Sequence, residues 1–187
     1  METSQLQYLT NEVDLTTLAA RCRQCYESLQ FGRNIITHEK LPTKILRTKS
    51  NTLNAFIINT NTQQQQQQQQ QQYPDRPAYG HWITLLIHRN IALICDGLAY
   101  AKSRIDVWSN IEQFCRNNKC KLVYLDLNCQ PRSSAKCGYH SLGFIAKYHT
   151  LPLHRFYSLQ YFFKRNNIKS NERFMMTFVQ KHFKFRL

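Results

Sequence analysis

The sequence predicts an α+β fold in which a mixed β-sheet lies between flanking helices. Three short apolar runs, over residues 82–88, 91–96 and 121–127, have the length and composition of buried strands. Apolar residues recur at helical spacing near both ends of the chain. Because 187 residues with 42% hydrophobic content can bury a sizeable core, we expect residues 1–187 to form one domain.

The expected elements follow one another along the chain. Residues 14–30 show an apolar face at helical spacing, and residues 53–59 have the pattern of a strand. The runs 82–88 and 91–96 are separated only by Arg89-Asn90, which predicts a hairpin with a two-residue turn. Both alternating faces of these runs are apolar, so we expect helices on both sides of the sheet. A capping box at Ser103–Asp106 predicts a helix to about 116, followed by a strand over 121–127 and helices over 137–148, 155–165 and 171–184.

Ten consecutive glutamines, Gln63 to Gln72, interrupt the chain before the first strand of the hairpin, and Pro74 and Pro77 follow them. This tract has no apolar side chain to bury, which predicts a disordered surface loop over about 61–77 between two strands. A linker between two domains is the alternative. It is disfavoured because the 60 residues before the tract would make a thin core of their own.

The charge of the chain is strongly positive, at +14 with a pI of about 9.7. Residues 131–187 contain eleven lysines or arginines and a single acid, Glu172. We expect a nucleic acid, and DNA in particular, as an acidic partner, the alternative being a solvated positive face. The interleaved aromatic rings are expected in the core, with the cations on phosphates. Candidate contacts are Lys147, Arg155, Lys164, Arg165, Lys169, Lys181, Lys184 and Arg186.

Seven cysteines, an odd number, are typical of free thiols in a reducing compartment. The first residues are polar, without the apolar run of a signal peptide, and no run reaches the roughly 18–20 apolar residues of a membrane span. We therefore expect a protein that is neither secreted nor bound to a membrane.

Individual cysteines invite different interpretations. Cys22-x-x-Cys25 resembles half of a zinc site, but no second Cys-x-x-Cys or His-x-x-x-His follows, so we predict no metal site. Cys95 and Cys129 are expected to be core thiols. Cys115 and Cys120, near the end of a predicted helix, are expected to be structural.

An ordered set of reactive side chains comes from the hairpin and the segment after the third strand. The order is His81, Asp96, Gln130 and then Cys137. With a two-residue turn, paired hairpin positions sum to 179, so His81 is a diagonal neighbour of Asp96 on the facing strand, with the two backbones about 7–8 Å apart. The acid would then hold the imidazole in one tautomer and stabilise its cation. An odd loop length would place the two side chains on opposite faces.

Cys137 lies where a loop is expected to enter a helix. Backbone N–H groups and the helix dipole favour a thiolate at that position. A neighbouring histidine would act first as a base and later protonate a leaving amine. The Gln130 amide and the Cys137 N–H could stabilise an oxyanion, worth about 3–4 kcal/mol for one such donor. The small Gly138 would let a substrate backbone approach, and the set predicts peptide-bond hydrolysis.

These residues carry a resemblance to a known family. Gly80-His81-Trp82, Asp96, Gln130 and Cys137-Gly138 resemble the motif of adenovirus-type (adenain-like) cysteine endopeptidases, relatives of the ubiquitin-like-protein proteases. Ser134-Ala135 also matches, and the likeness extends through Leu41-Pro42, residues 53–60 and residues 178–185. It implies a papain-like arrangement with the nucleophile at a helix N-terminus. Trp82 and Gly138 would support the substrate cleft and the oxyanion site.

The resemblance also implies a biological setting. It suggests a monomeric maturation protease of a virus or a virus-like element, cutting capsid or core precursors after glycine in the virion and in the host nucleus or cytoplasm. It implies no cofactor, but activation by DNA and by a short basic peptide. Departures from the family are an aspartate in place of the adenoviral glutamate and the added glutamine tract. Family members join the activating peptide through a disulfide, and Cys120 lies near the corresponding region, although it has no residue-by-residue match to the family's cysteine.

Two alternatives stay open on sequence alone. One is a protease of cellular type that uses the same residues on ubiquitin-like modifiers ending in Gly-Gly. The other is a catalytically inactive basic protein that binds nucleic acid, against which the intact set of His81, Asp96, Gln130 and Cys137 speaks.

Overall fold

A five-stranded mixed sheet forms the centre of the protein, and the predicted α+β class is confirmed. The computed structural model describes residues 12–45, 53–72, 80–98, 103–151 and 153–184. The strands lie in chain order across the sheet. They are β1 (Ile35–Thr37), β2 (Asn54–Asn59), β3 (Trp82–His88), β4 (Ile91–Asp96) and β5 (Lys121–Asp126).

The register of the sheet follows from the turn between β3 and β4. His88 pairs with Ile91, so the predicted two-residue turn at Arg89-Asn90 is confirmed. Arg89 has a φ of 56°, the left-handed conformation that tight hairpin turns require at their first central residue. β2, β3 and β4 are antiparallel, whereas β1 is parallel to β2 and β5 is parallel to β4.

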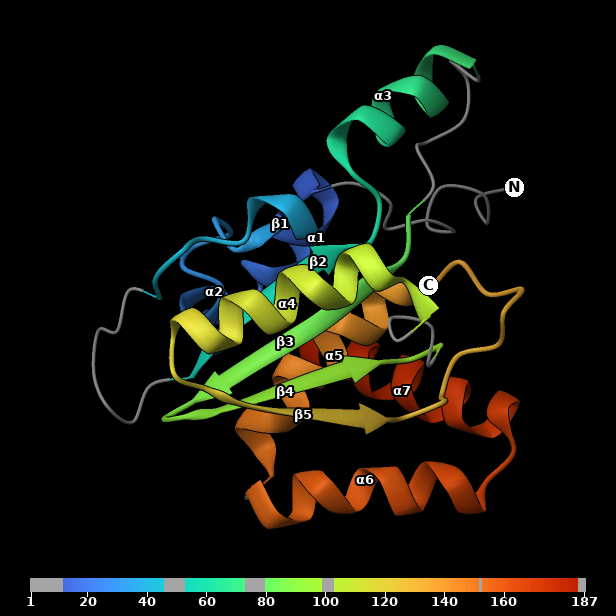
Figure 1. The fold of residues 1–187 in the computed structure, drawn as a ribbon. Helices are drawn as coiled ribbons and strands as arrows, with labels where there is room; N and C mark the ends of the chain where they lie inside the picture. The colour runs from blue at the N-terminus through green and yellow to red at the C-terminus, as the bar shows by residue number, and fades with distance from the viewer. Residues whose placement is uncertain (1–11, 46–52, 73–79, 99–102, 152, 185–187) are drawn as a thin grey trace.

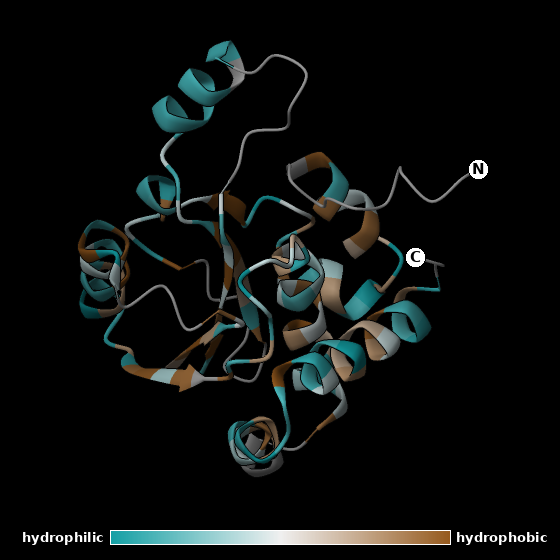
Figure 2. Ribbon diagram, turned by 90° about the vertical axis from the view of Figure 1, so that its right-hand side faces the viewer, coloured by the Kyte–Doolittle hydropathy of each residue, from teal (hydrophilic) through white to brown (hydrophobic). Residues whose placement is uncertain are grey.

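Helices cover both faces of the sheet, as the apolar pattern of β3 and β4 predicts (Figures 1 and 2). α4 (Ile105–Asn117) lies on one face, where its apolar residues pack with Phe56 and Ile58. The second apolar cluster, on the other face, includes residues of α5 (Cys137–Thr150) and α7 (Ile168–Phe183). α6 (Leu153–Arg165) contacts β5.

Several boundaries differ from the expectation. The predicted helix over 14–30 is two helices, α1 (Glu12–Ala19) and α2 (Arg23–Ser28), because Cys22 adopts an extended conformation between them. The N-cap of α4 is Arg104 and not the predicted Ser103; its side chain makes no capping hydrogen bond and pairs with Asp106 at 2.9 Å. β1 and the short helix η1 (His38–Lys40) were not predicted, since three residues are too few to show a period.

The glutamine tract is helical, in contrast to the predicted disorder. α3 (Gln63–Gln72) begins with a capping box, in which Gln65 N donates to Thr62 Oγ1 at 3.1 Å and Thr62 N donates to Gln65 Oε1 at 2.9 Å. Gln63 N also donates to Glu39 Oε1 at 3.0 Å. The helix lies along the chain between β2 and β3, which pair with each other, and it projects from the body of the protein (Figure 1). Residues 73–77 of the predicted loop lie outside the described residues.

Among the described helices, none is both long enough and apolar enough to cross a membrane.

Candidate active site

His81 and Asp96 are in direct contact at one end of the β3–β4 hairpin. His81 Nε2 lies 2.6 Å from Asp96 Oδ1, and the Asp96 side chain is fully buried. Leu98 N donates a second hydrogen bond to the same oxygen at 3.0 Å. The contact expected from the register of the two-residue turn is therefore present, with the carboxylate held by the backbone just after β4.

The surroundings of His81 favour its protonated form. Burial of the ring lowers its pKa, but the hydrogen bond with Asp96 and the influence of the nearby Asp96 and Cys137 raise the pKa to about 9. The same interactions place His81 between an acid and a thiol, which is the position of a base in thiol-dependent catalysis.

Cys137 is the first residue of α5, as predicted, and its side chain is partly exposed. The loop residue Lys136 forms the N-cap of this helix. Cys137 Sγ lies 3.9 Å from the carbonyl oxygen of Gly80, the residue just before His81. The thiol is therefore at the positive end of a helix and against the backbone that carries the histidine.

Gly80 can approach its neighbours closely because it has no side chain. A Cβ atom at this position would lie 2.0 Å from Asn59 Oδ1, at the buried end of β2. Next to it, Thr60 N donates to His81 O at 2.8 Å, and His81 N donates to Thr60 Oγ1 at 3.3 Å. The end of β2 thus positions His81. Sequence reasoning missed Asn59, although the glycine before the histidine was a visible signal.

Gln130 is buried and holds the loop that leads to Cys137. Its Nε2 donates to the carbonyl of Ser134 at 2.7 Å, and its backbone N–H donates to Gly97 O at 2.9 Å. The Ser134 hydroxyl donates to Glu172 of α7. An amide nitrogen carries two hydrogens, so the Ser134 bond occupies one of them and fixes the plane of the group. That the other stabilises an oxyanion at Cys137 stays a prediction.

A second cysteine–histidine pair lies deeper in the protein. Cys129 Sγ is 3.3 Å from His140 Nδ1, and both residues are buried. Burial, followed by the charges of His81 and Lys136, lowers the pKa of His140 to about 3. Burial also raises the pKa of the thiols of Cys129 and Cys95. The expectation that these two cysteines are core thiols is confirmed.

The two residues expected to support the substrate cleft are buried. Trp82 is only 2% exposed and belongs to the apolar core, so its side chain does not line an open cleft. Gly138 is buried in the first turn of α5. A groove of about 640 Å³ lies beside the loop before Cys137 and is lined by loop and α7 residues, among them Ser134, Lys136, Lys169, Glu172, Arg173 and Met176.

The predicted nucleic-acid contacts divide into two groups. Those that are exposed are Lys164, Arg165, Lys169, Lys181 and Lys184. Lys147 is instead partly buried, with its Nζ 3.8 Å from the centre of the Phe178 ring and 4.8 Å from that of Phe174. The ammonium packs against these rings, and its role as a phosphate contact stays a prediction. Arg186 and the side chain of Arg155 lie outside the described part of the structure.

No model of a known protein family and no curated protein sequence matches this chain. The arrangement of Cys137, His81 and Asp96 is therefore the basis for a functional proposal.

Proposed function

We propose that this protein is a cysteine endopeptidase with Cys137 as nucleophile, in a papain-like, adenain-like arrangement. The observation that carries the proposal is the position of His81. It contacts the buried carboxylate of Asp96 at 2.6 Å and also interacts with Cys137 at the N-terminus of α5. Acyl transfer by a thiol requires an acid, an imidazole next to it and a thiol near the imidazole.

In this proposal His81 first takes the proton of the Cys137 thiol as a base, which gives a thiolate beside the His81 cation. The thiolate attacks the scissile carbonyl, and the Cys137 N–H and the Gln130 amide stabilise the resulting oxyanion. The His81 cation then gives its proton to the leaving amine, which leaves a thioester on Cys137. A water molecule, deprotonated by His81, hydrolyses the thioester and restores the starting state.

Asp96 has a supporting role in this scheme. Its carboxylate holds Nε2 of His81 in a hydrogen bond and stabilises the imidazolium. Because Asp96 is fully buried, solvent does not screen this interaction. A carboxylate in surroundings of low dielectric constant raises the pKa of a neighbouring histidine and so favours its protonated form.

The substrate class rests on the resemblance of the motif residues to adenain-like proteases. We propose cleavage after glycine in precursors of capsid or core proteins of a virus or a virus-like element, with the enzyme acting as a monomer in the virion and in the host nucleus or cytoplasm. A protease of ubiquitin-like modifiers would use the same residues and would require a substrate tail that ends in Gly-Gly.

Quenched fluorescent peptides with and without a central glycine test the proposal. The wild-type chain is expected to cut after glycine, whereas the Cys137→Ala variant leaves the peptides intact. A ubiquitin-like protein with a reactive C-terminal probe separates the two substrate classes. Absence of cleavage in every peptide, with and without added DNA and a short basic peptide, would contradict the proposal.

We also propose DNA as a partner through the exposed cations near the junction of α6 and α7. Lys164 and Arg165 end α6, and Lys169 lies at the start of α7. Each lost phosphate contact should reduce the salt slope of binding by about 0.9. Replacement of both Lys164 and Arg165 by Ala is therefore expected to reduce the slope by about 2, whereas Lys119→Ala leaves it unchanged. Binding that does not depend on salt would exclude this surface as a phosphate contact.

A further inference from the structure

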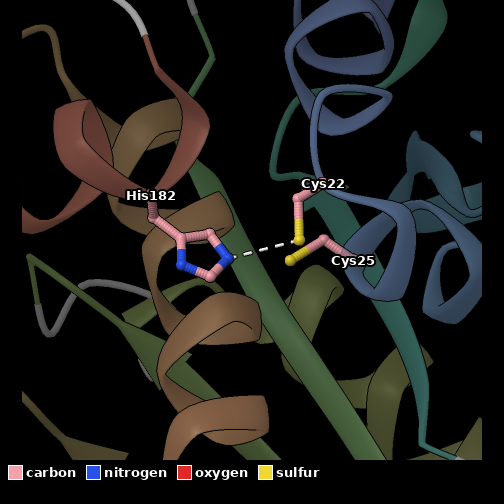
Figure 3. Close-up of side chains that lie close together, drawn as sticks. All are labelled: Cys22, Cys25 and His182. Carbon is pink, nitrogen blue, oxygen red and sulfur yellow. Dashed lines mark hydrogen bonds between the residues drawn. The ribbon is translucent and has the colours of Figure 1, made fainter.

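Three side chains with metal-binding atoms meet where the N-terminal helices contact the last helix (Figure 3). Cys22 is the N-cap of α2, Cys25 lies within α2, and His182 lies in the last turn of α7. Cys22 Sγ is 3.2 Å from His182 Nε2, and the three ligand atoms all lie within 4.8 Å of one another. The prediction of no metal site missed this cluster because the third side chain comes from 160 residues further along the chain.

The spacing of these atoms suits one tetrahedral ion. Zinc binds thiolate sulfur at about 2.3 Å and imidazole nitrogen at about 2.0–2.1 Å, which separates neighbouring ligand atoms by roughly 3.4–3.8 Å. The cluster needs only a small adjustment of its side chains to reach those separations. Two residues between the cysteines are also the usual spacing in zinc sites.

The chemistry of the donors selects the kind of metal. Two sulfurs and one imidazole nitrogen are soft or borderline ligands, and the set contains no carboxylate. Such a site favours Zn²⁺ over Mg²⁺ or Ca²⁺, which prefer oxygen. Cys25 is buried, whereas Cys22 and His182 are partly exposed, so the fourth position of a tetrahedral ion can be taken by a water molecule.

Packing holds His182 in place from the other side. Its ring stacks on Phe178, with ring centres 5.4 Å apart, and contacts Phe183 edge-on at 5.1 Å. Close by, Arg21 Nη1 donates to the carbonyl of Lys184 at 3.5 Å, a second link between the same two segments. These ring contacts within α7 thus help to hold the His182 side chain in its orientation towards the cysteines.

We propose that Cys22, Cys25 and His182 bind one Zn²⁺ ion, which joins the N-terminal helices to α7. Each thiol releases its proton to solvent as its Zn–S bond forms, and His182 binds through the lone pair of Nε2. The role of this ion is structural. It stabilises α7, the helix whose Glu172 holds Ser134 in the loop before Cys137.

The test measures bound metal in the full chain carrying Cys137→Ala, which removes the partly exposed thiol of the other site. The protein is reduced, incubated with Zn²⁺, desalted and analysed by elemental mass spectrometry. We expect one zinc per chain in this parent and none after addition of Cys22→Ser or His182→Ala. Cys120→Ser, which alters another partly buried thiol, should retain one zinc. Cobalt in place of zinc should give thiolate charge-transfer and tetrahedral visible bands.

One further variant and one further measurement separate a lost ligand from a lost fold. His182→Cys supplies a different zinc ligand at the same position and should restore binding of one ion, and zinc should raise the Tm of the parent but not of His182→Ala. Retention of zinc by His182→Ala, or its absence from the reduced parent, would overturn the proposal. A Cys22–Cys25 disulfide in the oxidised chain, with no zinc in the reduced chain, would identify a redox pair instead.

Discussion

Two cysteine–histidine pairs lie near the start of α5, and the pKa values of their histidines are shifted in opposite directions. In the outer pair, Asp96 and Cys137 raise the pKa of His81 to about 9 despite burial. In the inner pair, His140 contacts Cys129, and burial and nearby cations lower its pKa to about 3. The same two residue types thus give a histidine with a raised pKa near a partly exposed thiol in one place and a histidine with a lowered pKa in a buried pair in the other.

The difference shows what a cysteine and a histidine need besides proximity. A carboxylate beside the ring compensates for the loss of hydration of its cation, and His140 has only cations among the charges that shift its pKa. Access also differs, because Cys129 is fully buried while Cys137 is partly exposed. These differences favour the outer pair for the proposed chemistry and a packing role for the inner pair.

The largest expected effect separates the two thiols. Cys137→Ala removes the proposed nucleophile and should reduce kcat/KM for a glycine-containing peptide by at least about 10³-fold. Cys129→Ala removes a buried thiol and should leave most of the activity, at a cost in stability. Steady-state kinetics on both variants make the comparison, with circular dichroism to verify folding. Equal losses from the two substitutions would remove the distinction between the pairs.

Asp96→Asn should make the outer histidine behave more like the inner one. Loss of the carboxylate charge is expected to reduce kcat by about 10²–10⁴-fold. Because Asp96 raises the pKa of His81, the variant should also move the alkaline limit of activity from about 9 to lower pH. The measurement is kcat/KM against pH for both proteins. An unchanged alkaline limit would show that His81 is not the group that titrates.

Gln130→Glu tests the donor proposed for the oxyanion. The substitution keeps the size of the side chain but removes its N–H groups, and the expected loss in kcat is about 10²–10³-fold. The amide also donates to Ser134, so Ser134→Ala, which removes the anchor of the loop to Glu172, serves as a control for loop position. A larger loss from Ser134→Ala than from Gln130→Glu would favour a purely structural role for the glutamine.

The smallest effect concerns the contact that brings the outer pair together. Gly80→Ala would place a Cβ atom 2.0 Å from Asn59 Oδ1 and should lower the free energy of unfolding by about 1–3 kcal/mol. Activity should fall as well, since His81 follows Gly80 directly. Urea unfolding and kinetics measure both effects. Shortening the obstructing side chain with Asn59→Ala should recover part of the loss, and no recovery would show that the strain lies elsewhere.

The hairpin and the start of α5 could be predicted because their determinants are local. The apolar runs over β3 and β4 and the two residues between them set the register, and the register places His81 beside Asp96. The loop-to-helix transition at Cys137 is also a short-range signal. These local features were enough to identify the residues of the candidate site.

Other features depend on contacts that no local pattern contains. His182 reaches Cys22 across 160 residues, and Glu172 reaches Ser134 across 38. The place of Lys147 in the basic C-terminal segment did not reveal that two phenylalanines of α7 would pack against its ammonium. The glutamine tract has a composition typical of disorder, yet Thr62 and Gln65 cap it as a helix. Local composition could not anticipate these tertiary contacts.

Labelling with a reactive peptide tests the central assignment most directly. A peptide that ends in glycine and carries a thiol-reactive group should modify one cysteine, and peptide mapping by mass spectrometry identifies it. We predict stoichiometric modification of Cys137, slowed in Asp96→Asn, with Cys129 unmodified in the folded protein. Modification of Cys129 in preference to Cys137, or equal modification of several cysteines, would contradict the assignment of Cys137 and His81 as the catalytic pair.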